Sequence, residues 1–241
     1  MGNKYLVVLA SLNEELAIGN VLADIKKFIP DADVLVVDGY SRDKTAEVSL
    51  NHGAKVIQVD KAYGIAGAVE AGILYASQNN YSYLIRLDAD GQHPPEEIAK
   101  ILSSNLESNV DFIIGSRYLG EADYTESLLR KVSISSICFL LKALHKVKVT
   151  DCTSGCHIYS KNLIDYFATD SAFEYSEVRI IWMAHEAGFK IQETFINMAP
   201  RLTGESSFSP LNAANYMFKN LLDLVLSMPI FFKINRGKNS K

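Results

Sequence analysis

Two carboxylates, one residue apart, follow an apolar run near the middle of the chain. The run covers residues 83–87, and the carboxylates are Asp88 and Asp90. Gly91 then allows a turn, and Pro94-Pro-Glu-Glu favours the start of a helix, where proline is tolerated in the first turn. Carboxylate and amide oxygens suit a hard cation such as Mg²⁺ or Mn²⁺, which usually also binds substrate phosphates. The predicted metal ligands are Asp88, Asp90 and Gln92.

The alternative for this stretch is a plain strand-to-helix turn in which an aspartate serves as the helix cap. The nearby glutamine and the paired prolines, which accompany the two carboxylates, favour the metal site. Polar residues also follow other apolar runs, with Asn13 and Glu14 after the first and Asp38 after the second. Carboxyl ends of parallel strands share one edge of a sheet, where open α/β sheets bind ligands. These side chains are therefore expected to converge on one site.

The elements that must position these residues are predicted from apolar periodicity. Short apolar runs predict strands covered on both faces at residues 5–9, 34–37, 56–59, 83–87 and 112–114. Helical periodicity predicts helices at residues 16–28, 45–51 and 65–77, and later at 128–144 and 175–187, before a strand at 189–196. Alternating strands and helices predict an α/β fold with a mostly parallel central sheet and helices on both faces.

Composition excludes several classes of protein. The chain of 241 residues has 48% hydrophobic and 22% charged residues, as a soluble globular protein does, and its net charge of −4 argues against a nucleic-acid binder. The three cysteines form no metal-binding pair, so free thiols in a reducing cytosol are expected. We predict neither a signal peptide nor a membrane span. Without Gly-x-Gly-x-x-Gly or a Walker sequence, a Rossmann dehydrogenase or P-loop enzyme is not expected.

Several motifs together resemble those of family-2 glycosyltransferases. Asp88-Ala-Asp-Gly-Gln-His-Pro-Pro-Glu is similar to the metal-binding motif of the dolichol-phosphate or polyprenyl-phosphate mannose synthase branch. Ala10-Ser-Leu-Asn-Glu and residues 36–45 resemble the two preceding family motifs, except that Gly39 and Tyr40 replace the usual Asp and Gly. The resemblance covers about residues 4–208 and implies a GT-A-type, Rossmann-like sandwich. It implies that the base and ribose of a GDP- or UDP-linked sugar contact Asn13, Glu14 and Asp38.

Further motifs indicate where the acceptor binds. Arg117, Arg130 and Lys131 are suited to a phosphate, which arginine binds bidentately. Gly115-Ser-Arg-Tyr and Arg130-Lys-Val-Ser resemble the mannose synthase segments that contact the phosphate of a lipid acceptor. Asp151-Cys-Thr-Ser-Gly resembles another family motif, whose turn offers hydrogen bonds to sugar or phosphate. Residues 201–206 resemble a substrate-binding family motif. The additional substrate-binding residues predicted here are Asp88, Ser154, Arg201 and Ser206.

The expected reaction is metal-dependent, inverting sugar transfer, with Asp90, Asp151 and Glu177 as the predicted catalytic residues. The cation neutralises charge on the leaving nucleoside diphosphate. A polyprenyl or dolichyl phosphate acceptor requires no strong base, because a phosphate monoester with a second pKa of about 6 is already largely ionised. A sugar hydroxyl requires a general base, for which the candidates are Asp151, Glu174 and Glu177.

Residues 1–209 are predicted to form the catalytic domain, and residues 210–241 a separate helical tail. The tail has an apolar stripe followed by Lys233, Arg236, Lys238 and Lys241. That pattern suits either a peripheral membrane anchor or a helix packed on the domain or within a homodimer. The expected location is cytoplasmic, at the cytoplasmic face of the membrane.

Three other functions remain open at this point. The same fold can transfer sugar to a glycan or polysaccharide, a related fold transfers nucleotides, and a non-catalytic module binds sugar nucleotides. A nucleotidyltransferase normally has a glycine-rich first loop, which Ser11-Leu-Asn-Glu is not, and binding alone seldom needs a metal site. A glycosidase is not expected. Its two carboxylates must flank the scissile bond at roughly 5–10 Å, and Asp88 and Asp90 are too near to each other in the chain for that.

Overall fold

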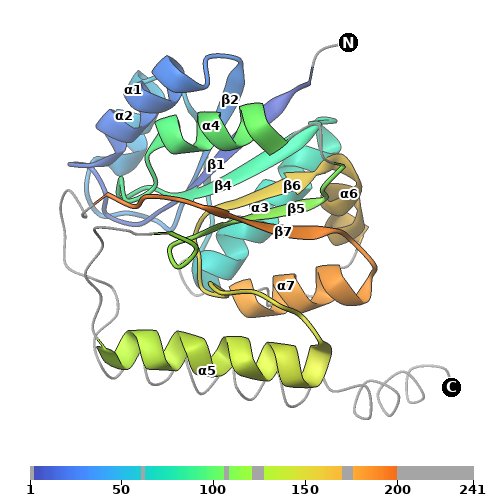
Figure 1. The fold of residues 1–241 in the computed structure, drawn as a ribbon. Coiled ribbons are helices and arrows are strands. Elements are labelled where there is room, and N and C mark those ends of the chain that lie inside the picture. The colour runs from blue at the N-terminus through green and yellow to red at the C-terminus, as the bar shows by residue number, and fades with distance from the viewer. Residues whose placement is uncertain (1–2, 61–62, 106–108, 121–127, 170–175, 200–241) are drawn as a thin grey trace, which may run out of the picture.

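In the computed structural model, the described part of the chain folds around one sheet of seven strands (Figure 1). The structure describes residues 3–60, 63–105, 109–120, 128–169 and 176–199. The strands are β1 (Tyr5–Ser11), β2 (Ala32–Asp38), β3 (Lys55–Gln58), β4 (Tyr83–Asp88), β5 (Phe112–Ser116), β6 (His157–Ser160) and β7 (Ile191–Phe195). The helices are α1 (Ile18–Phe28), α2 (Thr45–Asn51), α3 (Gly64–Gln78), α4 (Pro95–Asn105), α5 (Leu128–His145), α6 (Lys161–Thr169) and α7 (Glu177–Glu186).

The first half of the sheet is parallel, as predicted. Its order is β3-β2-β1-β4, and a helix connects each of these strands to the next one in the chain. The register pairs Ser11 with Asp38 and Ala10 with Asp88, so the ends of β1, β2 and β4 lie level with one another. The acidic residues that follow these strands therefore share one edge of the sheet, which confirms the expected α/β arrangement.

The second half of the sheet contains a strand and a helix that the sequence analysis did not predict. β6 lies between β4 and β5 and runs antiparallel to both, and α6 follows it directly. β6 has only four residues and begins with a histidine, so it lacks the apolar run that marks the other central strands. Its insertion separates β4 from β5 and brings the segment before it, residues 151–156, to the ligand-binding edge.

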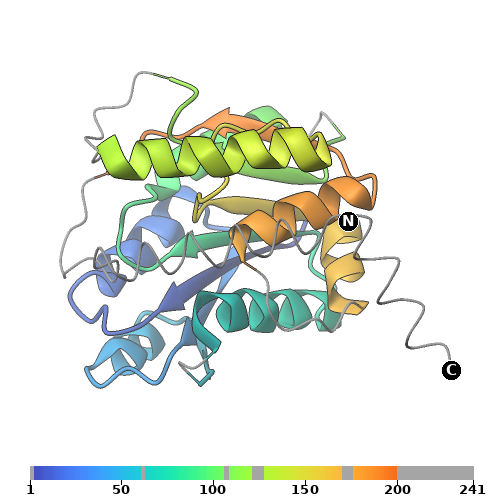
Figure 2. The same ribbon diagram turned by 90° about the horizontal axis from the view of Figure 1, so that it is seen from below.

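Helices cover both faces of the sheet. In β1, Val7 and Leu9 join one buried cluster with residues of α1 and α4, whereas Leu6 and Val8 join another with residues of α3, α5, α6 and α7. This alternation is the period of two expected of a strand buried on both faces. Figure 2 shows α5 in front of the sheet on the second face.

No helix within the described ranges is long and apolar enough to cross a membrane. The predicted tail, residues 210–241, lies outside these ranges. The division into a catalytic domain and a tail therefore stays a prediction.

His157 on β6 is a fully buried titratable group. Its ring meets Phe112 edge-on, with the ring centroids 5.0 Å apart, and its Nδ1 lies 2.8 Å from the hydroxyl of Tyr159. Burial lowers the pKa of His157 well below its usual value, and repulsion from Arg86 and His93 lowers it further. The folded protein therefore keeps this imidazole neutral at a pH where the unfolded chain protonates it.

We predict that this histidine weakens the fold in acid. The contribution of His157 to stability is fully present above the unfolded pKa of about 6.5. It falls as the pH drops below that value, because only the unfolded state gains the proton. From about pH 7.5 to about pH 5.5, the free energy of unfolding should fall by about 1.4 kcal/mol through this residue alone. Urea unfolding of the protein and of His157→Gln at several pH values measures how steeply the free energy of unfolding depends on pH in each. If the ring resonances of folded His157 titrate near pH 6.5 by NMR, the prediction is wrong.

Candidate functional site

The acid pair lies on a tight turn that begins at the end of β4. The side chain of Asp88 is 33% exposed, whereas Asp90 is 4% exposed, and Oδ1 of Asp90 accepts a hydrogen bond from the backbone N–H of Gln92 at 3.0 Å. Gly91 has a φ of 80°, a left-handed conformation that favours glycine. The structure thus brings the three predicted metal ligands onto one short turn, with an Asp88 oxygen accessible at the rim.

Gly155 forms a wall of this site. A Cβ atom at Gly155 would lie 2.2 Å from Oδ2 of Asp88 and 2.9 Å from Cε1 of His93. Real Cβ atoms do not approach other atoms so closely, so only glycine fits here without displacing Asp88. The residues 151–156, which the sequence analysis linked to substrate binding, therefore lie directly against the acid pair.

Ser154 connects this segment to β5 by a hydrogen bond. Its hydroxyl donates a hydrogen bond to the backbone oxygen of Gly115 at 2.5 Å and accepts one from the N–H of Cys156 at 3.1 Å. The side chain is 2% exposed. The single hydroxyl hydrogen is already used within the protein, and a role for Ser154 in binding substrate stays a prediction.

Arg117 and Asp151 form a bidentate ion pair inside the protein. Nε of Arg117 lies 2.6 Å from Oδ2 of Asp151, and Nη2 lies 2.7 Å from Oδ1. Arg117 is 5% exposed and Asp151 is fully buried. Glu193 on β7 supports the pair by accepting hydrogen bonds from the backbone N–H groups of Thr150 and Asp151 at 2.8 and 2.9 Å. Burial raises the pKa of Glu193, although these donors partly oppose the shift.

A second buried arginine lies beneath Asp88. Arg86 on β4 is 1% exposed, and its Nη2 lies 3.1 Å from Oε1 of Glu177 and 3.4 Å from Oδ1 of Asp88. Glu177 is the first residue of α7, so this arginine connects α7 with the acid pair. A buried charge requires a close partner of opposite sign, and Arg86 therefore orients both carboxylates.

The loops after β1 and β2 bind each other through hydrogen bonds. Oδ1 of Asn13 accepts from the N–H of Arg42 at 2.8 Å, and the hydroxyl of Thr45 accepts from the N–H of Glu14 at 2.8 Å. Asp38 is fully buried and accepts hydrogen bonds from both the backbone N–H and the hydroxyl of Ser41. The predicted donor-binding residues thus share one edge, but the carboxylate of Asp38 has no exposed atom to offer in this conformation.

Tyr40 is an exposed aromatic residue of the second loop. It has a φ of 57° and is 57% exposed. The family motif has glycine at this position, and the left-handed backbone explains why: few other residues adopt it without strain. This chain therefore presents an aromatic ring beside the predicted nucleotide site.

The remaining predicted residues are partly beyond the described ranges. Arg130 lies exposed in the first turn of α5. Glu174, Arg201 and Ser206 fall outside the described residues, so their roles stay predictions. The sequence analysis missed Arg86, although a charged residue within an apolar strand is a signal that it has a buried partner. It also missed the contact of Gly155 with Asp88, which depends on the position of β6.

The oxygen ligands on this turn fit a cation that keeps several coordination positions open. Within the described ranges, no three His, Cys, Asp or Glu side chains form a metal-binding cluster by themselves. Two carboxylates and a glutamine supply oxygen ligands for Mg²⁺ or Mn²⁺, and such ions usually complete their shell with water and substrate phosphates. The predicted ligands Asp88, Asp90 and Gln92 therefore fit a site that the substrate completes.

Comparison with known proteins agrees with the motifs. Residues 6–167 match the model of the family described as glycosyl transferase family 2. The chain is 30% identical to the dolichyl-phosphate hexose transferase of Haloferax volcanii, over 91% of this chain and 93% of that protein. It is 29% identical to the polyprenol monophosphomannose synthase of Mycolicibacterium smegmatis, over 89% of this chain and 84% of that protein. It is 27% identical to the undecaprenyl-phosphate mannosyltransferase of Micrococcus luteus, over 86% of this chain and 88% of that protein.

Solved structures share the fold. Glucosyl-3-phosphoglycerate synthase from Mycobacterium tuberculosis, in complex with Mn²⁺, UDP and glucosyl-3-phosphoglycerate, aligns with a TM-score of 0.68 at 18% identity. The alignment covers 94% of this chain and 80% of that protein. This likeness confirms the predicted GT-A-type α/β fold.

We predict that Gly155→Ala greatly lowers any Mn²⁺-dependent activity of this site, because the new methyl group must displace Asp88. A shift of about 1 Å in a reacting site can cost on the order of 10²-fold in rate. The rate is measured over a Mn²⁺ titration. Gly19→Ala on α1 is the matched control, because its Cβ would meet only side-chain atoms of His52 and Val48 at 3.3 Å or more. Equal rates for the two variants would contradict the proposed wall.

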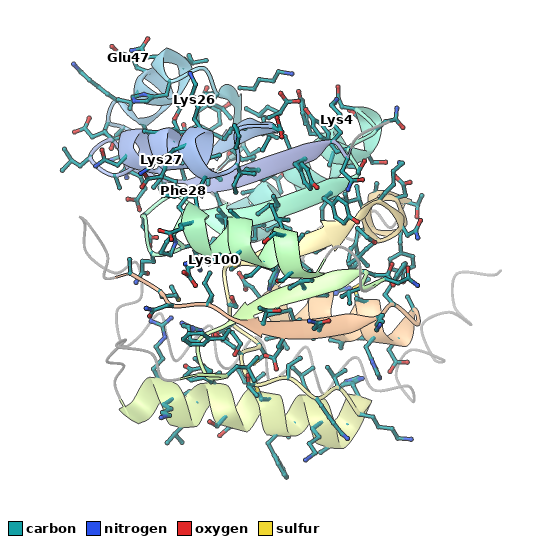
Figure 3. All side chains as sticks on the ribbon, turned by 45° about the horizontal axis from the view of Figure 1, so that its top comes forward. Lys4, Lys26, Lys27, Phe28, Glu47 and Lys100 are labelled. Carbon is teal, nitrogen blue, oxygen red and sulfur yellow. The ribbon has the colours of Figure 1, made fainter. Side chains whose placement is uncertain are left out.

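We also predict that Arg86→Met destabilises the fold by about 3–5 kcal/mol, because it leaves buried Glu177 without its cation. The double variant Arg86→Met, Glu177→Gln should recover part of this loss, since the unpaired charge is gone. Urea unfolding of Arg86→Met, of Glu177→Gln and of the double variant gives the coupling energy. Lys100→Met is the surface control: Lys100 lies on α4 (Figure 3), its side chain is 61% exposed, and it pairs with Glu96 and Glu97, so its loss should change stability little. Additive effects at Arg86 and Glu177 would show that they do not act as a pair.

Proposed function

The chain belongs to glycosyl transferase family 2 and is a glycosyltransferase, and from this we propose that it transfers a sugar from a nucleotide sugar to the phosphate of a polyprenyl phosphate. The relatives named above support this acceptor, since their names specify polyprenol, undecaprenyl phosphate or dolichyl phosphate. They match this chain over most of the length of both proteins.

The observation that carries the proposal is the state of the two candidate general bases that the structure describes; the third candidate, Glu174, lies outside the described residues. Asp151 is sealed from solvent by its bidentate pair with Arg117, and Glu177 is 9% exposed and paired with buried Arg86. A carboxylate held in this way does not reach a substrate hydroxyl to accept its proton. A phosphate acceptor needs no such base at neutral pH. We therefore assign Asp151 and Glu177 to positioning the two arginines.

On the donor side, Asp88, Asp90 and Gln92 would hold the metal ion. Bound there, Mg²⁺ or Mn²⁺ would stabilise negative charge on the departing nucleoside diphosphate. Arg86 and Gly155 fix the direction of the Asp88 carboxylate, and the loops after β1 and β2 bind the nucleoside through Asn13 and Glu14. Asp38 keeps the second loop in shape by accepting hydrogen bonds from Ser41.

On the acceptor side, exposed Arg130 in the first turn of α5 attracts the phosphate. The motif assigns Arg117 to the same phosphate, and in this conformation Arg117 is 5% exposed and paired with Asp151. The acceptor oxygen attacks the anomeric carbon from the face opposite the leaving group, which inverts the configuration. Arg201 and Ser206 are assigned to the substrate by the motif alone. Contact with the cytoplasmic face of a membrane and a homodimer are further expectations.

The acceptor class is tested with a panel of GDP- and UDP-linked sugars, Mn²⁺ and three acceptors: a polyprenyl phosphate, the same polyprenol without phosphate, and a glycan. Release of nucleoside diphosphate should require the polyprenyl phosphate. The rate should rise with pH through about 6, where the second phosphate oxygen ionises, and then level off. Asp90→Ala is the inactive control. Comparable turnover with polyprenol or glycan would refute the phosphate acceptor and favour transfer to a hydroxyl.

A further inference from the structure

Tyr40 has a backbone conformation that is costly for an aromatic residue. Its φ is 57°, in the left-handed region, and the residue is 57% exposed. Within the described ranges, the other non-glycine residues with a positive φ are three asparagines and a lysine, and asparagine tolerates this region better than most residues. A ring that lies mostly in solvent gains little from packing, so packing does not explain a strained tyrosine here. Residues with such strain cluster at ligand sites.

Hydrogen bonds on both sides fix the loop that carries Tyr40. The backbone N–H of Ser41 donates to Oδ2 of Asp38 at 3.1 Å, and the hydroxyl of Ser41 accepts from the N–H of Asn13 at 2.8 Å. The N–H of Arg42 donates to the side-chain oxygen of Asn13 at 2.8 Å. The ring is therefore presented by a fixed loop, and a ligand that stacks on it does not have to order the backbone first.

Leu12 adds an apolar side chain beside this ring. It is 47% exposed, and a Cβ atom at Gly39, the neighbour of Tyr40, would lie 3.4 Å from Cδ1 of Leu12. The N–H of Gly39 also donates to the backbone oxygen of Ser11 at 2.9 Å, which connects the loops after β1 and β2. Leu12 and Tyr40 thus form one exposed apolar surface, which suits a flat aromatic ligand group.

This surface lies at the same edge of the sheet as the acid pair. β1 lies between β2 and β4, Ala10 pairs with Asp88, and the N–H of Ala89 donates to the backbone oxygen of Ala10 at 3.3 Å. The loop after β2 is therefore two strands from Asp88, or about 10 Å at the usual strand spacing, which the ribose and α-phosphate of a nucleotide can span. Tyr63 is also exposed, but it follows β3, which is one strand farther away.

The start of the loop after β2 offers few polar groups to a ligand. Asp38 is fully buried, and its carboxylate accepts hydrogen bonds from Ser41 and, at 3.4 Å, from Nε2 of Gln58. Gly39 has no side chain. The contact that remains between Asp38 and Ser41 is the exposed ring of Tyr40.

We propose that Tyr40 stacks on the base of the donor nucleotide, with Leu12 beside it. This inference rests on the proposed function, because it places the diphosphate of that nucleotide at Asp88 and Asp90. Stacking on an aromatic side chain suits purines and pyrimidines alike, since every base has a π-face. Tyr40 therefore contributes to the affinity for both UDP and GDP, and the strain in its backbone serves to present the ring.

Isothermal titration calorimetry of the full-length protein with Mn²⁺, without sugar or acceptor, tests this contact. Tyr40→Gly should weaken the binding of UDP and of GDP by about 5- to 150-fold, the range expected for the loss of one base–aromatic contact. Tyr40→Phe keeps the ring and should bind both as tightly as the unaltered protein does. Inorganic pyrophosphate has no base, so Tyr40→Gly should bind it as tightly as the unaltered protein does.

The same variant separates binding from folding. Glycine adopts a φ of 57° without strain, so Tyr40→Gly should raise the temperature of thermal unfolding by about 2–4 °C while it weakens nucleotide binding. Phe139→Ala is the control for the loss of an exposed ring. Phe139 is 68% exposed on α5, a helix on the side of the sheet away from α1 and α2 (Figure 1), and its loss should leave the binding of UDP unchanged.

Three results would overturn the proposal. In the first, Tyr40→Gly binds UDP and GDP as tightly as Phe139→Ala does. In the second, Tyr40→Gly loses affinity for pyrophosphate to the same degree as for the nucleotides, which would mean that the ring acts through the metal site and not on the base. In the third, the unaltered protein binds neither pyrophosphate nor a nucleoside diphosphate with Mn²⁺, in which case the proposed donor site is itself wrong and this inference falls with it.

Discussion

Two arginine charges buried within the fold constrain the rest of the site. Arg86 lies in a central strand and Arg117 just beyond the end of another, and they are only 1% and 5% exposed. A buried cation is tolerated only when carboxylates approach it closely, so each arginine determines where its partners lie. Glu177 and Asp88 meet Arg86, and Asp151 meets Arg117. The start of α7, the end of β4 and the turn before β6 are thereby held in one arrangement.

This constraint separates the acidic groups of the site into two kinds. Asp88 keeps an exposed side at the rim, where a cation and the phosphates of a nucleotide can reach it. Asp151 and Glu177 face inward and neutralise arginines. Sequence motifs treat all of these residues as site residues, but their exposure assigns them different tasks. The absence of an accessible base among these paired carboxylates is what favours an ionised phosphate as the acceptor.

The antiparallel strand β6 connects the two halves of the site. It brings Gly155 against Asp88, and Ser154 ties the same segment to the end of β5. The parallel half of the sheet supplies the loops of the proposed donor site, whereas the segment before β6 supplies the partners of Arg117, Asp151 and Thr153, and β7 supplies Glu193 behind Asp151. The proposed donor and acceptor regions thus meet at the short segment between them.

The sequence by itself determined the class of fold, most of its elements and the identity of the acid pair. These features depend on local patterns: apolar runs for buried strands, helical periodicity, and acidic residues at strand ends. The tertiary structure alone decided which site residues are accessible and which pair with one another. Arg86 lies 91 residues from Glu177 in the chain, Arg117 lies 34 residues from Asp151, and Gly155 lies 67 residues from Asp88. No local pattern encodes such contacts, because they arise only when β6 inserts between β4 and β5 and the buried charges find their partners.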